Sequence, residues 1–126
     1  MNKIFLALSL ICSSSCLAQR ASIDNDTASY NGKRYIVGDT INLAYGSDQG
    51  KKFAFVQMGG ALLGLKRLQS TYSKGQVKVD KVYKQLGKCY LRGKMIDQPM
   101  PPGYKIFIDL EGAVDNKEMK ENPTFR

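Results

Sequence analysis

The stretch Tyr104-Lys105-Ile106-Phe107-Ile108-Asp109-Leu110 gives the strongest indication of how this chain of 126 residues folds. A large apolar side chain stands at every second position, from Tyr104 to Leu110. A period of two is the spacing of side chains on one face of a β-strand. The preceding residues 97–103 include three prolines, which cannot donate hydrogen bonds inside a sheet, and they are predicted to form a loop. We therefore predict a strand with one face in the core of a β-sheet.

Other short runs of β-favouring residues precede this strand. Val77 and Val79 alternate with polar residues, and the phase slips at Lys81-Val82, which indicates a β-bulge. Residues 61–68 fit a helical stripe as well as a strand, and Gly64 together with the neighbouring runs favours a strand. The further predicted strands cover residues 34–37, 40–45, 53–56, 77–82 and 88–94.

Turn and helix signals complete the prediction. Residues 46–50 have the composition of a turn, and Gly59-Gly60 is predicted to end the strand at 53–56. Residues 112–120 are predicted to form one short helix with Ala113 and Val114 facing inward. Short strands separated by frequent turns are typical of small barrels and sandwiches. We predict an all-β fold of five to six strands with one short C-terminal helix.

Tyr35-Ile36-Val37-Gly38-Asp39-Thr40-Ile41-Asn42-Leu43 resembles the opening of SH3-like barrels, in which a Val-Gly-Asp turn leads into the first barrel strand. The Phe-rich run at 53–56 and the closing segment 105–114 make the layout similar to small, uncharacterised secreted proteins of Bacteroidetes-type bacteria. The resemblance implies a small SH3-like barrel, with an OB-like barrel as the alternative. It implies no activity and no site residues.

The first 18 residues have the pattern of a secretory signal peptide. Lys3 is followed by the apolar run 4–12 and then by small residues up to Ala18. The run is shorter than the ~20 apolar residues of a membrane-spanning helix. We predict cleavage between Ala18 and Gln19 and export to the periplasm or the medium. The alternative is a lipoprotein signal, with the mature protein anchored through an acylated Cys16.

Removal of residues 1–18 leaves 108 residues, which is enough for one domain. The polar segment 19–31 is predicted to be a flexible leader, residues 32–120 the domain, and residues 121–126 a loose tail. Cys89 is then the only cysteine, so no internal disulfide is expected, and its neighbours indicate a small buried side chain. No membrane span is expected in the mature protein.

Several chemistries are disfavoured by composition. The chain has no histidine, which excludes Ser-His-Asp and Cys-His catalysis and imidazole ligands for zinc or haem. No phosphate-binding loop or complete calcium loop is present. Asp109 and Glu111 would share the polar face of a strand, which we interpret as solvated. We predict a protein that is not an enzyme and needs no cofactor.

The charge is uneven along the chain. Residues 51–94 hold eleven basic residues against one acidic residue, whereas residues 19–50 and 97–126 are each slightly acidic. This layout indicates either a charge match within the molecule or a surface for an anionic partner.

The candidate site lies in this basic segment. Lys88, Tyr90, Arg92 and Lys94 alternate with apolar residues, so they should share one face of a strand. The plain interpretation is a solvent face on which lysine stems cover apolar surface. The functional interpretation is an exported module for an unknown envelope or extracellular partner. Its alternative is a basic face for an anionic polymer: a glycan, a lipid headgroup or, less expected outside a cell, nucleic acid.

Overall fold

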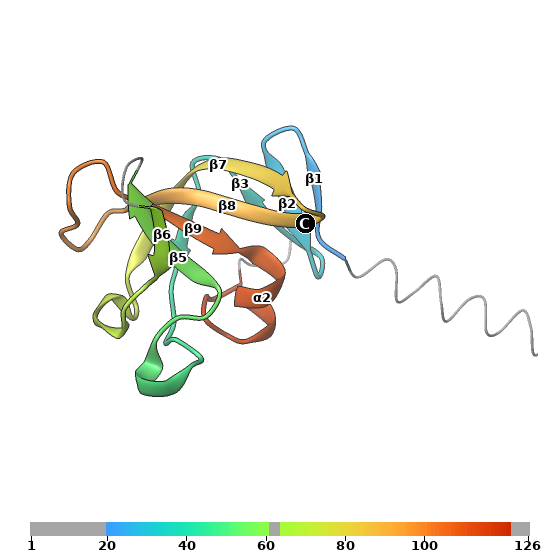
Figure 1. Cartoon of the computed structure of the whole chain (residues 1–126). Coiled ribbons are helices and arrows are strands. Elements are labelled where there is room, and N and C mark those ends of the chain that lie inside the picture. Colours follow the sequence, from blue (N-terminus) through green and yellow to red (C-terminus); the bar gives the residue numbers. More distant parts are fainter. Residues whose placement is uncertain (1–19, 61–63, 122–126) are drawn as a thin grey trace, which may run out of the picture.

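The structure is a computed structural model that describes residues 20–60 and 64–121, and its strands form two antiparallel sheets (Figure 1). The smaller sheet holds three consecutive strands, β1 (Ser22–Asp24), β2 (Thr27–Tyr30) and β3 (Lys33–Ile36). The larger sheet has the order β4-β7-β8-β9-β5-β6. Its strands are β4 (Thr40–Asn42), β5 (Val56–Gly60), β6 (Gly64–Arg67), β7 (Gln76–Gln85), β8 (Lys88–Met95) and β9 (Lys105–Asp109).

Residues 20–60 and 64–121 also contain three short helical elements. The helix α2 (Leu110–Asp115) follows β9 directly, and the 3₁₀ turns η1 (Gln49–Lys51) and η2 (Ser70–Tyr72) lie in the loops around β5 and β6. No helix among the described residues is long and apolar enough to cross a membrane.

The predicted all-β class with one short helix is confirmed, but the predicted barrel of five to six strands is not what forms. Residues 20–60 and 64–121 contain nine strands in two sheets and no closed barrel. The six-stranded sheet ends at β4 on one side and at β6 on the other, and these two strands do not pair. Alternation within a strand reports which face is buried and not whether the first and last strands meet.

The stretch that carried the fold prediction lies in the middle of the larger sheet. β9 pairs with β8 on one side and β5 on the other, and Ile106 and Ile108 are fully buried. Leu110 is also buried, although it already belongs to α2. The predicted bulge is confirmed, because the β7–β8 register shifts between Val79 and Lys81. Ala113 and Val114 face inward as predicted.

The segment predicted as a flexible leader is instead largely part of the domain. Residues 22–30 form β1 and β2, Ala28 is fully buried, and Ile23 packs against the core. The polar cluster that suggests a leader is the hairpin turn between the two strands, where Asn25 adopts a φ of 56°. The predicted signal peptide, Cys16, Ala18, Gln19 and residues 122–126 of the predicted tail lie outside the described residues.

The strand predicted at 53–56 begins later than expected. Only Val56 belongs to β5, which runs through Gly59-Gly60, where a break was predicted. Gly59 is needed there because a Cβ atom would overlap the Gly64 carbonyl oxygen of β6. β6 confirms a strand in the described part of 61–68; residues 61–63 are outside it.

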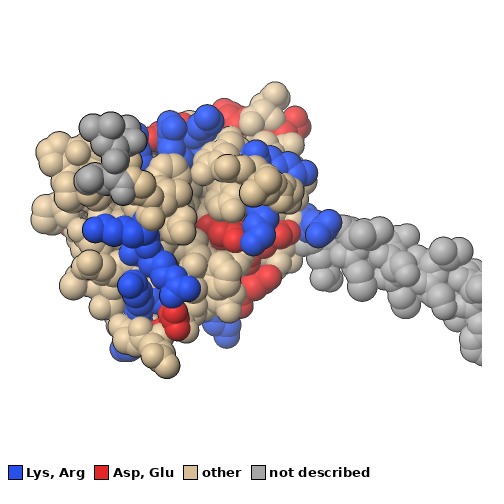
Figure 2. All heavy atoms as spheres, viewed as in Figure 1, with Lys and Arg blue, Asp and Glu red and all other residues tan. Residues whose placement is uncertain are grey.

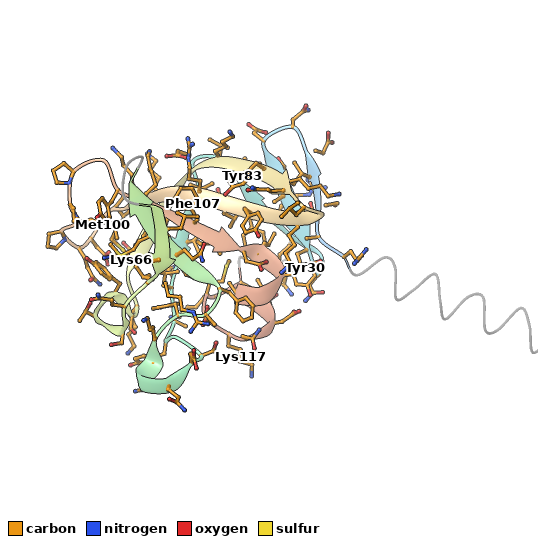
Figure 3. All side chains as sticks on the ribbon, viewed as in Figure 1. Tyr30, Lys66, Tyr83, Met100, Phe107 and Lys117 are labelled. Carbon is orange, nitrogen blue, oxygen red and sulfur yellow. The ribbon has the colours of Figure 1, made fainter. Side chains whose placement is uncertain are left out.

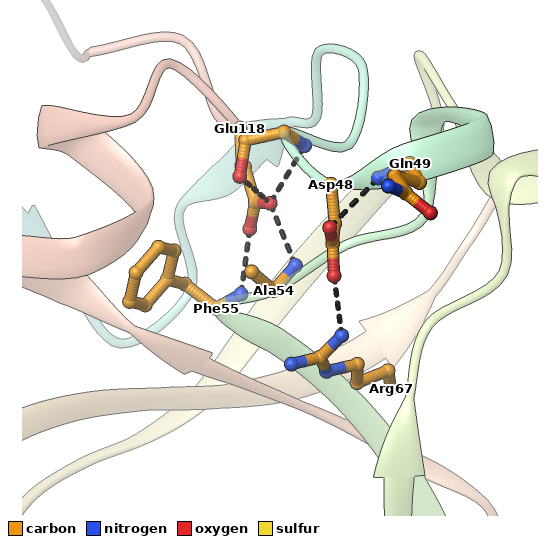
Figure 4. Close-up of polar contacts among 7 residues, drawn as sticks. Asp48, Gln49, Ala54, Phe55, Arg67 and Glu118 are labelled. Atoms are coloured by element: carbon orange, nitrogen blue, oxygen red, sulfur yellow. Dashed lines mark hydrogen bonds and ion pairs between the residues drawn. The ribbon is translucent and has the colours of Figure 1, made fainter.

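A buried carboxylate fixes the loop that leads into β5. Glu118 is fully buried after α2, and its oxygens accept hydrogen bonds from the Ser47 backbone (2.9 Å) and hydroxyl (2.6 Å) and from the backbone N–H groups of Ala54 (2.7 Å) and Phe55 (2.8 Å) (Figure 4). These four donors replace the water that a buried charge loses. Glu118 thereby sets the backbone position of Phe55.

Candidate ligand-binding face

β8 presents the four predicted residues on the outer face of the larger sheet. Cys89 and Leu91 point into the core, at 1% and 0% exposure, while Lys88, Tyr90, Arg92 and Lys94 point the other way. Cys89 is part of the core packing, as predicted, and its burial raises the pKa of the thiol. The period-two assignment of this face is therefore correct.

Two of the four predicted residues are held by carboxylates. Arg92 Nε lies 2.7 Å from one oxygen of Asp80, and Lys105 Nζ lies 2.5 Å from the other. Burial raises the pKa of Asp80, but the hydrogen bonds from Lys105 and Arg92 outweigh that effect and lower it overall. Lys88 Nζ lies 3.5 Å from Asp109. The Asp80 pairs restrict Arg92 and Lys105 to set positions on the sheet, whereas the Lys88 side chain is 56% exposed and its contact is longer.

The structure adds aromatic side chains that the sequence reasoning did not include. Tyr83 on β7 stands opposite Tyr90, and their rings stack with centroids 5.4 Å apart and planes 17° from parallel. Phe107 on β9 stands opposite Arg92, on the same outer face (Figure 3 labels Tyr83 and Phe107). The bulge at Asp80 turns Tyr83 outward, because one extra residue exchanges the two faces of β7. Two features of the sequence could have identified these aromatic residues. The phase slip at Lys81-Val82 indicates that Tyr83 points outward, and the position of Phe107 among the polar residues of its strand indicates the same.

A shallow hollow of about 90 Å³ opens beside Tyr90. Its lining comes from β5, β8, β9 and the loop before β5: Ala54, Phe55, Gln57, Tyr90, Phe107 and Asp109. The Phe55 ring rests against Gly112 of α2, where a Cβ atom would overlap it. A glycine inside a helix is otherwise unfavourable, so its place here is explained by the ring that it admits.

Asp109 joins the hollow to the helix and to the cations. One of its oxygens accepts a hydrogen bond from the Gly112 backbone N–H (3.3 Å) and caps α2, and the other faces Lys88. The predicted shared strand face of Asp109 and Glu111 does not form. Glu111 lies in the first turn of α2 and accepts a hydrogen bond from the Ala21 backbone N–H (2.8 Å).

A second hollow of about 170 Å³ lies near the other end of β8, beside Lys78, Asp80, Lys94 and Ile96. No acidic side chain within the described residues forms an ion pair with Lys78, Lys81 or Lys94. On the outer face of β7, β8 and β9, two carboxylates (Asp80 and Asp109) therefore lie among six cations, which are Lys78, Lys81, Lys88, Arg92, Lys94 and Lys105.

The side of the molecule that Figure 2 shows carries charges of both signs. In the view of Figure 2, Lys and Arg atoms occur at several places with Asp and Glu atoms between them. The Arg67–Asp48 pair, at 2.5 Å, is one example (Figure 4). In residues 20–60 and 64–121, no group of three or more His, Cys, Asp or Glu side chains is placed to hold a metal ion.

Comparison of the chain with protein-family models, curated proteins and solved structures found no significant match. The resemblance to secreted SH3-like proteins therefore stays a prediction.

Proposed function

We propose that this chain is an exported, non-catalytic binding module that holds an anionic polymer on the outer face of its six-stranded sheet. One observation carries the proposal: a row of partly buried aromatic rings on three adjacent strands lies among cations that outnumber the nearby carboxylates. Aromatic faces stack on the rings of a polymer, and unbalanced cations attract its acidic groups. The expected signal peptide makes envelope glycans or lipid headgroups the expected partners, rather than nucleic acid.

The ion pairs on this face support recognition rather than general charge attraction. An arginine that is already oriented by a carboxylate loses less conformational freedom when a ligand binds. Arg92 and Lys105 share Asp80 in this way, while Lys78, Lys81 and Lys94 have no acidic partner among the described residues. Arg92 and Lys105 therefore fit the role of positioning the ligand. The other three lysines supply net attraction for its acidic groups.

Charge reversal of Lys78, Lys81 and Lys94 to Glu tests the proposal without breaking the Asp80 and Asp109 pairs. Retention of the purified chain on immobilised heparin is measured between about 50 and 200 mM salt, because counterion release makes binding to a polyanion fall steeply with salt over this range. We expect the wild-type chain to bind at the lower salt concentration and the variant to lose affinity by about tenfold or more.

The matched control reverses Lys51, Lys52 and Lys74, which changes the net charge equally in the loops around η1 and η2. The proposal requires the sheet variant to lose much more affinity than this loop variant. Equal losses, a larger loss in the loop variant, or no binding of the wild-type chain would each refute it.

A further inference from the structure

We infer that the hollow beside Tyr90 receives a single sugar ring, so that the polymer bound on this face is an acidic glycan. This inference rests on the proposed function and specifies its ligand. It follows from the aromatic walls of the hollow, from the polar groups beside them and from the course of β8 toward a second hollow.

Tyr83 stacks on Tyr90, and Tyr90 but not Tyr83 lines the hollow. Tyr90, Phe107 and Phe55 form the apolar walls, so a ring that enters the hollow can pack against aromatic side chains.

The polar part of the wall favours hydroxyl groups over phosphate. Asp109 is an acceptor with its side chain only 13% exposed, and Gln57 offers both an acceptor and donors. Sugar hydroxyls can donate to the carboxylate and accept from the amide. Any acidic group next to Asp109, whether phosphate, sulfate or carboxylate, would place two negative charges together in a partly buried site, so the acidic groups of the glycan must lie outside the hollow.

The second hollow indicates a ligand longer than one ring. Positions 90 and 94 of β8 are four residues apart, about 13 Å along a strand. The second hollow lies beside Lys78, Lys94 and Asp80, and neither lysine has an acidic partner in the described structure. A short chain of sugars along β8 would place a ring beside Tyr90 and its acidic groups near these lysines.

The test compares three probes by isothermal titration calorimetry: a heparin-derived hexasaccharide, the neutral maltohexaose and a thymidine hexanucleotide. We expect the acidic hexasaccharide to bind the wild-type chain most tightly. Tyr90→Ala should weaken it by roughly tenfold through lost stacking, without changing the salt dependence. Asp109→Asn, which keeps a side chain able to cap α2, should also weaken it.

Tyr45→Ala is the matched control, because Tyr45 is an exposed tyrosine that lies between Lys51 and Lys74, away from the outer face. It should leave the affinity unchanged. Stronger binding of the hexanucleotide, or a Tyr90→Ala variant that binds as well as wild type, would overturn the sugar assignment and leave the proposed anionic-polymer function standing. Failure of both acidic probes to bind would overturn both.

Discussion

Glu118 shows how one residue can support a surface that it does not reach. Its carboxylate is fully buried and holds the backbone of Ala54 and Phe55, and Phe55 in turn lines the hollow beside Tyr90. Nothing in its sequence context marks it, since it is one acidic residue in a polar C-terminal segment. Its importance arises only when the chain brings residues 47–55 beside it.

We expect Glu118→Gln to destabilise the chain by about 2–3 kcal/mol, because the amide replaces an acceptor oxygen with a donor that faces backbone N–H groups. Urea unfolding followed by circular dichroism measures the change. Glu121→Gln serves as the control, since Glu121 makes a more exposed pair with Lys33 and should change stability by less than about 1 kcal/mol. Similar values for the two variants would contradict the assigned role of Glu118.

Replacement of Gly112 by alanine is expected to change the stability in the opposite direction from the usual effect in a helix. Glycine to alanine inside an exposed helix normally stabilises by about 1 kcal/mol. Here the added methyl group would overlap the Phe55 ring, so we expect Gly112→Ala to destabilise by about 1–3 kcal/mol. Thermal unfolding measures the sign directly. A raised melting temperature would show that Phe55 does not need this space.

Among the elements, the bulge in β7 has the largest effect on the candidate face. It turns Tyr83 outward next to Tyr90, and it brings Asp80 between Arg92 and Lys105. The pairing of the two strands thus produces both the aromatic stack and the ordered cations. Neither feature can be assigned from β8 alone.

The Asp80 pairs predict a pH dependence. The pKa of Asp80 is lower in the folded chain than its ordinary value of about 3.9, so its contribution to stability is present above that pH and is lost as the pH falls through the folded-state pKa. We expect Asp80→Asn to be less stable than wild type near neutral pH and to approach it at strongly acidic pH. Urea unfolding at several pH values measures the difference. A gap between the two proteins that does not shrink in acid would contradict this role.

Alternation of apolar and polar residues correctly predicted the strands that have one buried and one exposed face. The alternation in β8 and β9 and the phase slip in β7 correspond to observed strands and an observed bulge. The patterns failed where a long-range contact decides the outcome. β1 contains one large apolar residue, Ile23, and is held mainly by its pairing with β2, while β5 tolerates Gly59-Gly60 because β6 approaches it closely.

The candidate site was predictable only in part for the same reason. Lys88, Tyr90, Arg92 and Lys94 share a strand, so their common face follows from spacing alone. Tyr83, Phe107 and Phe55 come from three other segments, and their place beside Tyr90 depends on sheet order and on the contacts of Glu118 and Gly112. Tertiary structure assembles the hollow.

At the scale of the whole molecule, the uneven charge reflects both a charge match within the chain and an excess of cations on one surface. Asp48 and Asp109, from the acidic ends, pair with Arg67 and Lys88 of the basic middle, which is a charge match within the chain. The outer face of β7, β8 and β9 still holds more cations than carboxylates. This excess on an aromatic surface is the basis of the proposed function.

The most direct test of that function is to map the bound polymer on the molecule by ¹H–¹⁵N NMR spectra of the labelled chain, titrated with the heparin-derived hexasaccharide. The proposed function predicts that the largest shift changes fall on residues 88–94 and 105–109, with Tyr83 included. Changes confined to the loops around η1 and η2, or no changes at low salt, would contradict it.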